Sequence, residues 1–461
     1  MVSVDRNTGS GFVNLIAPFN VQGQTGQAPV PENFFVSITG STGGSNNIHE
    51  LDNLSICALR SNPVGQQIDH IELTHQATGI ACVASAVQVK ACLNADCSTL
   101  FTSPVSVDLS NSAGNWQTDP ITLTNGVGTA YLRHPAGGVA TIGVTETVPP
   151  RKAFSQTVCK VGSNSSNCQI NFANAGLLFA QADGVTPLSH QTAGVAFNGV
   201  LRAIRTNTTT GACEARAEGT KTVRLGFSCE NPSSCIAGQQ FKINGTPIAA
   251  NNEGTLINRS EVNLEFDNNG SAPLRSMDYS DVGQLRLHAS LAVPEQAPDP
   301  AITLNGSSNA FVVRPHTLAV VQALRQNGSA NPATQTGGNG FVAAGEPFNV
   351  VIEARNADGQ ATPNFGKELN RQRGEAVFNQ LVYPPSGNNG TLNGGAVDTA
   401  TAALNGRQTV TGVSWNEAGS ITLRAKMLND TYLGIADISV KPVSETVGRF
   451  YPDNFALASS E

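Results

Sequence analysis

Asn-Gly dipeptides constrain the fold of this 461-residue chain more than any other feature of its sequence. Asparagine and glycine tolerate the positive φ that both central residues of a type I′ turn require, so the dipeptide is the strongest short-range signal of a β-hairpin. The ten copies begin at Asn125, Asn198, Asn244, Asn269, Asn305, Asn327, Asn339, Asn389, Asn393 and Asn405. These signals predict a chain of short antiparallel strands.

Apolar and polar residues alternate in many of the runs between these turns. A period of two over four to six residues is typical of a strand with one buried face. The clearest runs are Val87/Val89/Ala91, Val105/Val107/Leu109, Ile121/Leu123, Val262/Leu264/Phe266, Leu285/Leu287/Ala289 and Ile421/Leu423/Ala425. The best helix candidate, 365–381, is interrupted by Gly374 and favours a long loop. The prediction is therefore an all-β protein.

The nine cysteines indicate disulfides and export. Three pairs close short polar loops, as stapled turns of exported proteins do: Cys92 with Cys97, Cys159 with Cys168, and Cys229 with Cys235. Zinc is the weaker alternative, because no Cys-x2-Cys pair occurs and histidine is rare, so no metal site is predicted. Cys57 and Cys82 can form a fourth bridge. Cys213 is then left over or competes for Cys229 and Cys235, and the connectivity stays open.

An oxidising compartment implies an export signal, yet Met1–Asn7 has no apolar core of a signal peptide. We therefore expect the signal and the first part of the N-terminal domain to lie upstream. No stretch of about 18 apolar residues is long enough to span a membrane. The composition, with 13% charged residues, a net charge of -7 and scattered Lys and Arg, argues against nucleic acid and anionic lipid as partners.

A weak internal repeat organises the chain. The closing strands Gly138–Val144, Gly283–Ala289 and Gly419–Ala425 resemble one another, and so do two apparent opening strands, Phe311–Val320 and Arg449–Leu457. All-strand repeats of roughly 100–150 residues are typical of tandem Ig-like sandwiches. The predicted domains are the end of an N-terminal domain at 1–58, an Ig-like sandwich at 59–150, a larger sandwich with disulfide loops at 151–309, an Ig-like sandwich at 310–445, and the first strand of a further domain at 446–461.

The N-terminal run Phe34–Leu54 consists of an apolar strand, a Gly/Ser/Asn loop and a second strand. It resembles the closing hairpin of L-type (concanavalin-like) lectin domains, which implies that residues 1–58 are the C-terminal part of a jelly-roll, lectin-like sandwich. The resemblance places a sugar-binding loop at Thr42, Gly43, Gly44, Ser45, Asn46 and Asn47. Small residues there would let backbone N–H groups approach sugar hydroxyls. The alternative is a hairpin loop without a ligand. Calcium ligands of such a lectin would lie upstream, so no cofactor is predicted within this chain.

A second resemblance covers nearly all of the chain from about residue 50. Its motifs are Val87–Phe101, Arg314-Pro315, Ala344–Phe348, Ala361–Gly366, Gly412–Trp415 and Val447–Phe455. They are similar to those of MshQ-type proteins, which accompany the mannose-sensitive haemagglutinin type IV pili of Gram-negative bacteria. Asn454 departs from the family pattern, in which His is frequent. The resemblance implies a location outside the cell, on the surface or the pilus, with pilin or surface glycans as partners.

No residue pattern calls for an enzyme. The chain has no Gly-x-Ser-x-Gly elbow, no His-Glu-x-x-His and no phosphate loop. His49 and Glu50 are adjacent, so on a strand they point to opposite faces. Trp116 and Trp415 are predicted to be core residues rather than exposed sugar platforms. The main hypothesis is a non-enzymatic adhesin or stalk of a type IV pilus system. The alternatives are a pilus assembly factor that binds pilin by strand addition, and a secreted glycoside hydrolase with Ig-like modules, which requires two facing carboxylates.

Overall fold

The structure, a computed structural model, describes residues 2–7, 12–19, 25, 66–152, 155–162, 164–295, 300–398, 402–436 and 442–455. The chain forms two compact units, Met1–Ser61 and Asn62–Glu461. In the first unit β1 (Val2–Asn7) pairs antiparallel with β2 (Phe12–Phe19). The predicted lectin-like hairpin, its loop at 42–47 and Cys57 lie outside the described residues.

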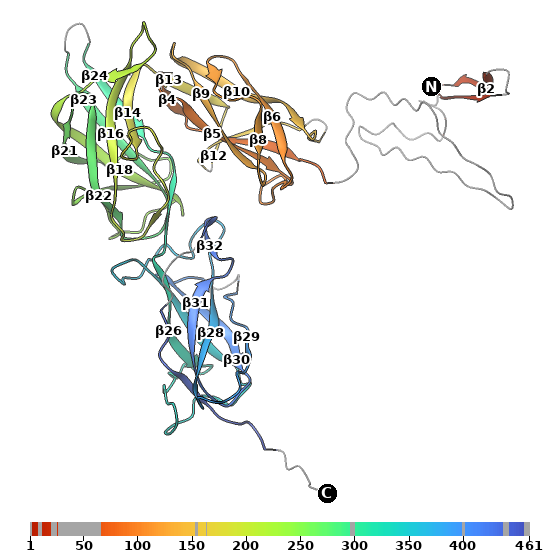
Figure 1. Cartoon of the computed structure of the whole chain (residues 1–461), viewed down its shortest axis with the longest axis vertical. Helices are drawn as coiled ribbons and strands as arrows, with labels where there is room; N and C mark the ends of the chain where they lie inside the picture. Colours follow the sequence, from red (N-terminus) through yellow and green to blue (C-terminus); the bar gives the residue numbers. More distant parts are fainter. Residues whose placement is uncertain are drawn as a thin grey trace. The chain divides into compact units, whose positions relative to one another are not determined.

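Every regular element in the described part of the chain is a strand, which confirms the all-β prediction (Figure 1). Within these residues there is no helix long and apolar enough to cross a membrane. The second unit contains three consecutive β-sandwiches, called here the first, second and third sandwich.

The first sandwich has two sheets with strand orders β4-β13-β10-β6-β8 and β12-β11-β3-β5-β9-β7. Its strands are β3 (His70–Thr74), β4 (Thr78–Ile80), β5 (Ser85–Cys92), β6 (Val105–Asn111), β7 (Asn115–Trp116), β8 (Ile121–Leu123), β9 (Val127–Arg133), β10 (Gly138–Val148), β11 (Val158–Val161), β12 (Asn164–Ser165) and β13 (Gln169–Ala173). The predicted alternation is observed: Val87 and Val89 on β5 and Val105 and Val107 on β6 are fully buried. These facing side chains form the core between the two sheets.

The predicted boundary at residue 150 is corrected by the strands that follow it. β11 pairs in parallel with β3, with Cys159 opposite Leu73, and β13 pairs with β10. The first sandwich therefore extends to Ala173, and the Cys159–Cys168 loop belongs to it rather than to the next domain. Strand spacing suggests where a strand lies along the chain but does not reveal which sheet it joins.

The second sandwich is built around one continuous path of strands, β14-β16-β22-β19-β20-β18-β23-β25-β15, with β17, β21 and β24 added at its sides. The bounds are β14 (Ala175–Ala180), β15 (Gln191–Thr192), β16 (Phe197–Thr206), β17 (Cys213–Ala215), β18 (Gly219–Asn231), β19 (Phe241–Ile243), β20 (Thr246–Asn252), β21 (Ser260–Phe266), β22 (Ser271–Tyr279), β23 (Gly283–Val293), β24 (Ile302–Ser307) and β25 (Phe311–Arg314). The rings of Phe227, Phe241 and Tyr279 pack together in its core, with centroids 5.6 to 6.2 Å apart.

The third sandwich has a four-stranded sheet, β26-β27-β30-β29, and a three-stranded sheet, β28-β31-β34. Its strands are β26 (Thr317–Arg325), β27 (Phe348–Arg355), β28 (Gly374–Tyr383), β29 (Leu392–Asn393), β30 (Arg407–Trp415), β31 (Gly419–Met427), β32 (Thr431–Tyr432), β33 (Ile435–Ala436) and β34 (Val447–Phe450). Trp415 is fully buried and stacks on Phe378 at 4.9 Å between ring centroids. It is a core residue, as predicted.

The assignment of 446–461 to a further domain is also corrected. β34 pairs with β31, with Ile421 opposite Val447, so it closes the third sandwich. In the same way β25 pairs with β23 and closes the second. The repeated motif taken as an opening strand therefore begins on the last strand of a sandwich. At Phe311–Val320 only Pro315 and His316 separate the closing strand from the next opening strand, so the two strands appeared as one motif.

Candidate functional site: the joints between the sandwiches

Four disulfides join eight of the cysteines. Three of them close short loops within one sandwich: Cys92–Cys97, Cys159–Cys168 and Cys229–Cys235, with sequence separations of 5, 9 and 6 residues. The first two lie in the first sandwich and the third lies in the second. These bridges hold loops within a sandwich and do not connect domains.

The fourth disulfide corrects the pairing of Cys57 with Cys82. Cys82 follows β4 of the first sandwich, and it is bonded to Cys213, which begins β17 of the second. The two cysteines are 131 residues apart in sequence, and their Cα atoms are 5.2 Å apart. Sequence reasoning favours near neighbours and assigned Cys213 no definite partner. The topology instead brings Cys213 beside Cys82, so the bridge joins two consecutive sandwiches covalently.

Apolar packing and hydrogen bonds surround this bridge. The side chains of Ile80 and Cys82 pack with Ile204 of β16 in a small buried cluster. At the edge of the joint the Arg133 guanidinium donates a hydrogen bond of 2.5 Å to the carbonyl oxygen of Gly211. The joint thus combines a covalent bond with a packed interface, the two features that limit rotation between neighbouring domains.

A buried polar network extends from the same joint into the second sandwich. Arg286 donates from its guanidinium to Gln76 of the first sandwich and pairs with Glu230 at 3.7 Å. Ser228 Oγ lies 2.8 Å from His288 Nε2. A serine–histidine pair invites a hydrolase interpretation, but the exposed fraction of Ser228 is 2%, which leaves a substrate no access to its hydroxyl. Burial also lowers the pKa of His288 to about 4 and keeps the ring neutral. The network is therefore structural.

The joint between the second and third sandwiches is held by a loop that follows β27. Buried apolar side chains form one uninterrupted cluster through both sandwiches, whereas the first sandwich has a core of its own. Several hydrogen bonds cross this joint, among them Asn356 Nδ2 to Ser280 O (3.1 Å), Ala357 N to Ala193 O (2.9 Å), Asn364 N to Asp281 Oδ1 (3.1 Å) and Leu369 N to Asn231 Oδ1 (2.8 Å). Sequence reasoning missed these residues, because nothing in the sequence marks a loop as an interface.

Two carboxyl groups lie inside this second joint. Asp281 is fully buried and accepts hydrogen bonds from the backbone N–H groups of Val282 and Asn364. Glu368 is 4% exposed, and its Oε1 accepts a hydrogen bond of 2.8 Å from the Tyr432 hydroxyl. Burial raises the pKa of each carboxyl to about 7. Two buried acids whose charges repel each other at an interface make its stability depend on pH.

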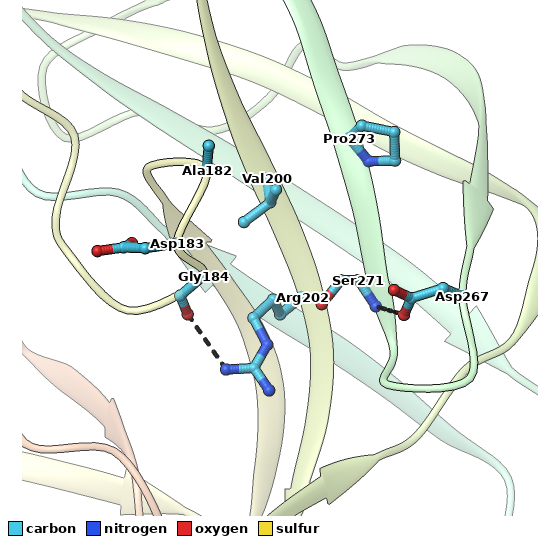
Figure 2. Close-up of a pocket in the computed structure, with 8 residues that line it drawn as sticks. All are labelled: Ala182, Asp183, Gly184, Val200, Arg202, Asp267, Ser271 and Pro273. Atoms are coloured by element: carbon cyan, nitrogen blue, oxygen red, sulfur yellow. Dashed lines mark hydrogen bonds between the residues drawn. The ribbon is translucent and has the colours of Figure 1, made fainter.

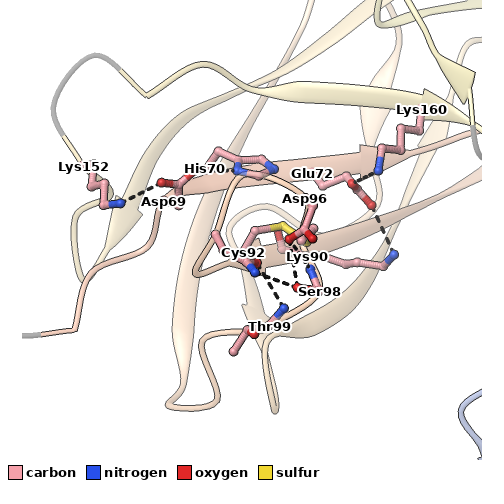
Figure 3. A network of polar contacts seen from close by, with 12 residues as sticks. Asp69, His70, Glu72, Lys90, Cys92, Asp96, Ser98, Thr99, Lys152 and Lys160 are labelled. Atoms are coloured by element: carbon pink, nitrogen blue, oxygen red, sulfur yellow. Dashed lines mark hydrogen bonds and ion pairs between the residues drawn. A yellow bond between two sulfur atoms is a disulfide. The ribbon is translucent and has the colours of Figure 1, made fainter. Parts of the chain in front are cut away.

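A polar cluster in the first sandwich offers four atoms of the kinds that bind metals. His70, Glu72, Cys92 and Cys97 place these atoms within 4.8 Å of one another. The disulfide between the two cysteines removes the thiolates that a metal would need. The Glu72 carboxylate lies between the ammonium groups of Lys90 (3.2 Å) and Lys160 (2.5 Å), as Figure 3 shows. The cluster is thus a buried ion-pair network beside a disulfide.

Substituting Glu72→Gln is expected to lower the free energy of unfolding by roughly 1–3 kcal/mol, because two lysines lose their shared counter-charge. Burial alone would raise the pKa of Glu72, but the two ammonium groups outweigh it and the net pKa is lowered. A lowered pKa means that the contribution is present near neutral pH and is lost as the carboxylate protonates in acid. Urea denaturation at pH 7 and pH 3.5 should show a difference from the wild type that shrinks in acid.

The matched control for this prediction is Asp430→Asn, because Asp430 forms an exposed pair with Lys426. Its effect on the free energy of unfolding should stay within about 0.5 kcal/mol at both pH values. Equal losses in the two variants would show that the burial of Glu72 is unimportant.

A shallow pocket of about 500 Å³ lies on the second sandwich, between β16, β22 and neighbouring loops (Figure 2). Two carboxylates line it, as a glycoside hydrolase would require, but both hold their own loops. Asp183 accepts hydrogen bonds from the backbone N–H groups of Val185 and Thr186. Asp267 accepts a hydrogen bond of 2.8 Å from the backbone N–H group of Ser271. The hydrogen bond from the Thr186 hydroxyl, together with the backbone bonds to Asp183, lowers the pKa of Asp183, whereas a general acid needs a raised one. This pocket lends no support to the hydrolase alternative.

Four family models match consecutive segments of the chain. Residues 68–150 match the domain of unknown function DUF8613. Residues 156–307 match DUF6701, first Ig-like domain; residues 314–411 match its second domain; and residues 417–461 match its third. The end of the DUF8613 match and the start of the first DUF6701 match differ from the structure, in which residues 158–173 complete the first sandwich. The match to the third DUF6701 domain begins inside the third sandwich.

Several solved structures resemble the chain at low similarity. The D0–D1 domains of intimin are 11% identical, with 50% of this chain and 96% of that chain covered and a TM-score of 0.19. The tetra-tandem repeat of the extending region of a large adhesion protein is 11% identical, with 82% of this chain and 74% of that chain covered and a TM-score of 0.26. The Yersinia pseudotuberculosis adhesin InvE is 14% identical, with 63% of this chain and 70% of that chain covered and a TM-score of 0.17. Likenesses of this size carry no argument about function.

No curated protein matches this chain. The family matches agree with the all-β structure in both the kind of domain and their tandem order. The chain therefore carries the three DUF6701 domains in order, the first of them described as Ig-like, behind a DUF8613 domain.

Proposed function

We propose that this chain is the stalk of an extracellular adhesin and performs no catalysis. The disulfide between Cys82 and Cys213 carries the proposal, because it joins two consecutive sandwiches by a covalent bond. Such a bond transmits force from one domain to the next without relying on their interface. Four disulfides also favour an oxidising environment outside the cytoplasm.

A more specific part of the proposal concerns the system in which the stalk works. Three consecutive DUF6701 domains are consistent with the MshQ-type resemblance, and that resemblance suggests a type IV pilus system. In this proposal the lectin-like segment at residues 1–58 recognises surface glycans through the loop 42–47, while the sandwiches display it. A role in binding pilin subunits is the competing proposal.

A domain-replacement experiment tests the stalk role. Residues 68–455 are replaced, in the bacterium that produces the chain, by three unrelated Ig-like sandwiches of similar length. If these residues act as a spacer, cells carrying the replacement should adhere about as well as the wild type. A gene deletion and a replacement by a single sandwich provide the matched controls, and both should reduce adhesion.

Loss of adhesion in the three-sandwich replacement, with normal surface display, would contradict the stalk role. It would mean that the surfaces of these sandwiches bind a partner, and pull-down with purified pilin would then decide for the assembly role. Glycan-array binding of the whole chain, with and without calcium, tests the sugar-recognition part separately.

A further inference from the structure

We propose that the joint between the second and third sandwiches is a pH-responsive hinge, docked in mild acid and loosened in mild alkali, with Asp281 and Glu368 as the responsive groups. The proposal concerns a property of the joint and is independent of what the stalk carries. It depends on where these two side chains lie and what surrounds them.

The first observation is that the loop 364–369 of the third sandwich is held by the second sandwich at both ends. At one end Asn364 N donates to both oxygens of Asp281, at 3.1 and 3.2 Å, and Asn364 Nδ2 donates to Val282 O at 3.2 Å. At the other end Leu369 N donates to Asn231 Oδ1 at 2.8 Å. Glu368 lies within this loop. Undocking the two sandwiches would therefore break these bonds, expose Asp281 to water and free the loop that holds Glu368.

The second observation is the absence of close compensating charge among the described residues that face the two carboxyls. The titratable residues that face Asp281 and Glu368 are Tyr279 of β22, Lys367 of the loop and Tyr432 of β32. Burial raises the pKa of both tyrosines well above the usual value, so they stay neutral across the physiological range. Lys367 attracts the Asp281 charge, but its side chain is exposed and forms no ion pair with it. Glu368 itself repels the charge of Asp281.

The direction of the effect follows from linkage. Burial raises the pKa of both carboxyls to about 7 in the docked state, whereas exposed carboxyls titrate near 4. The docked state therefore binds more protons between about pH 4 and pH 7, and docking weakens as the pH rises through this interval. Each carboxyl can change the docking equilibrium by up to about tenfold per pH unit. Above about pH 7 the equilibrium becomes independent of these two groups.

The test measures the distance between the two sandwiches in the full chain. Spin labels are attached at Glu261→Cys on β21 and Thr411→Cys on β30, two exposed strand positions, with Cys57→Ser in the background. We expect a narrow distance distribution at pH 5.5 that broadens as the pH rises to about 7 and then changes no further up to pH 8.5. A wild-type distribution that is the same at the two pH values would overturn the proposal.

Two variants separate titration of these carboxyls from other effects of pH. Asp281→Asn with Glu368→Gln mimics the protonated state and should keep the distribution narrow at both pH values. Glu417→Gln removes an exposed carboxyl from the turn between β30 and β31 of the third sandwich and should behave like the wild type. Broadening at pH 8.5 in the double variant would overturn the assignment to these two groups. If the double variant does not dock at pH 5.5, Asp281→Asn alone takes its place with the same expectation of a reduced pH response.

Discussion

When the two ends of the chain are pulled apart, the segment between Cys82 and Cys213 should stay out of the extended chain until the disulfide is reduced. The bridge spans 131 residues, which corresponds to about 460 Å of extended polypeptide. Strands β5 to β16 lie inside this loop, so most of the first sandwich is shielded from the force. Reduction should therefore add about 460 Å to the total length released by unfolding.

Single-molecule force spectroscopy of the full chain, with and without a reducing agent, measures this length. The matched variant is Cys82→Ser with Cys213→Ser, in which the loops closed by Cys92–Cys97 and Cys159–Cys168 stay locked. It should release roughly 400 Å more than the oxidised wild type. Closing so long a loop also stabilises the folded state by about 4–5 kcal/mol in the chain-entropy model. Equal released lengths in the oxidised wild type and the variant would contradict the covalent joint.

Replacing Trp415 by alanine should lower the free energy of unfolding of the third sandwich by about 3–5 kcal/mol. Its indole is fully buried and stacks on Phe378, so the substitution removes a large apolar contact and leaves a cavity. Trp415→Phe keeps part of the stack and should cost less. Urea denaturation followed by circular dichroism measures both changes.

The control for the tryptophan prediction is Leu404→Ala in the same sandwich, at a side chain that is 73% exposed. Its effect should stay within about 0.5 kcal/mol, as for most surface substitutions. A loss for Trp415→Ala no larger than that of the control would show that this residue is not a core residue, and would reopen its role as an exposed binding platform.

The Asn-Gly dipeptides show how far the fold could be predicted from the sequence. At Asn125, Asn244 and Asn405 both the asparagine and the following glycine have positive φ, the tight-turn geometry that the dipeptide predicts. Asn198 and Asn305 instead lie within strands β16 and β24. At Asn305 the following glycine is needed for space, because a Cβ there would lie 1.9 Å from the carbonyl oxygen of Leu177. The same dipeptide thus marks turns at some positions and close strand packing at another.

Long-range pairing is what the sequence could not supply. The alternation of apolar residues predicts strands, and it correctly placed the buried faces of β5, β6 and β31. Which sheet a strand joins depends on contacts far along the chain, so β11 and β34 were assigned to the wrong domains. The partner of Cys82 was missed for the same reason, because the nearer Cys57 was preferred to a cysteine in the next sandwich.

The joint residues carried no signal either. Asp281 and Asn364 lie in loops of different sandwiches, 83 positions apart, and each is an ordinary polar residue in its local sequence. Only the docking of the two sandwiches turns them into a buried hydrogen-bonded pair. A reader of the sequence would place both on the surface, since unpaired Asp is almost never fully buried.

Mass-spectrometric mapping of the disulfides in the unreduced chain tests the central claim most directly. Digestion under conditions that prevent thiol exchange should yield a peptide pair that links Cys82 to Cys213, with Cys57 recovered as a free thiol or bonded to another molecule. That result would establish the covalent joint between consecutive sandwiches. A pair linking Cys57 to Cys82, with Cys213 free, would contradict the joint and with it the observation that carries the stalk proposal.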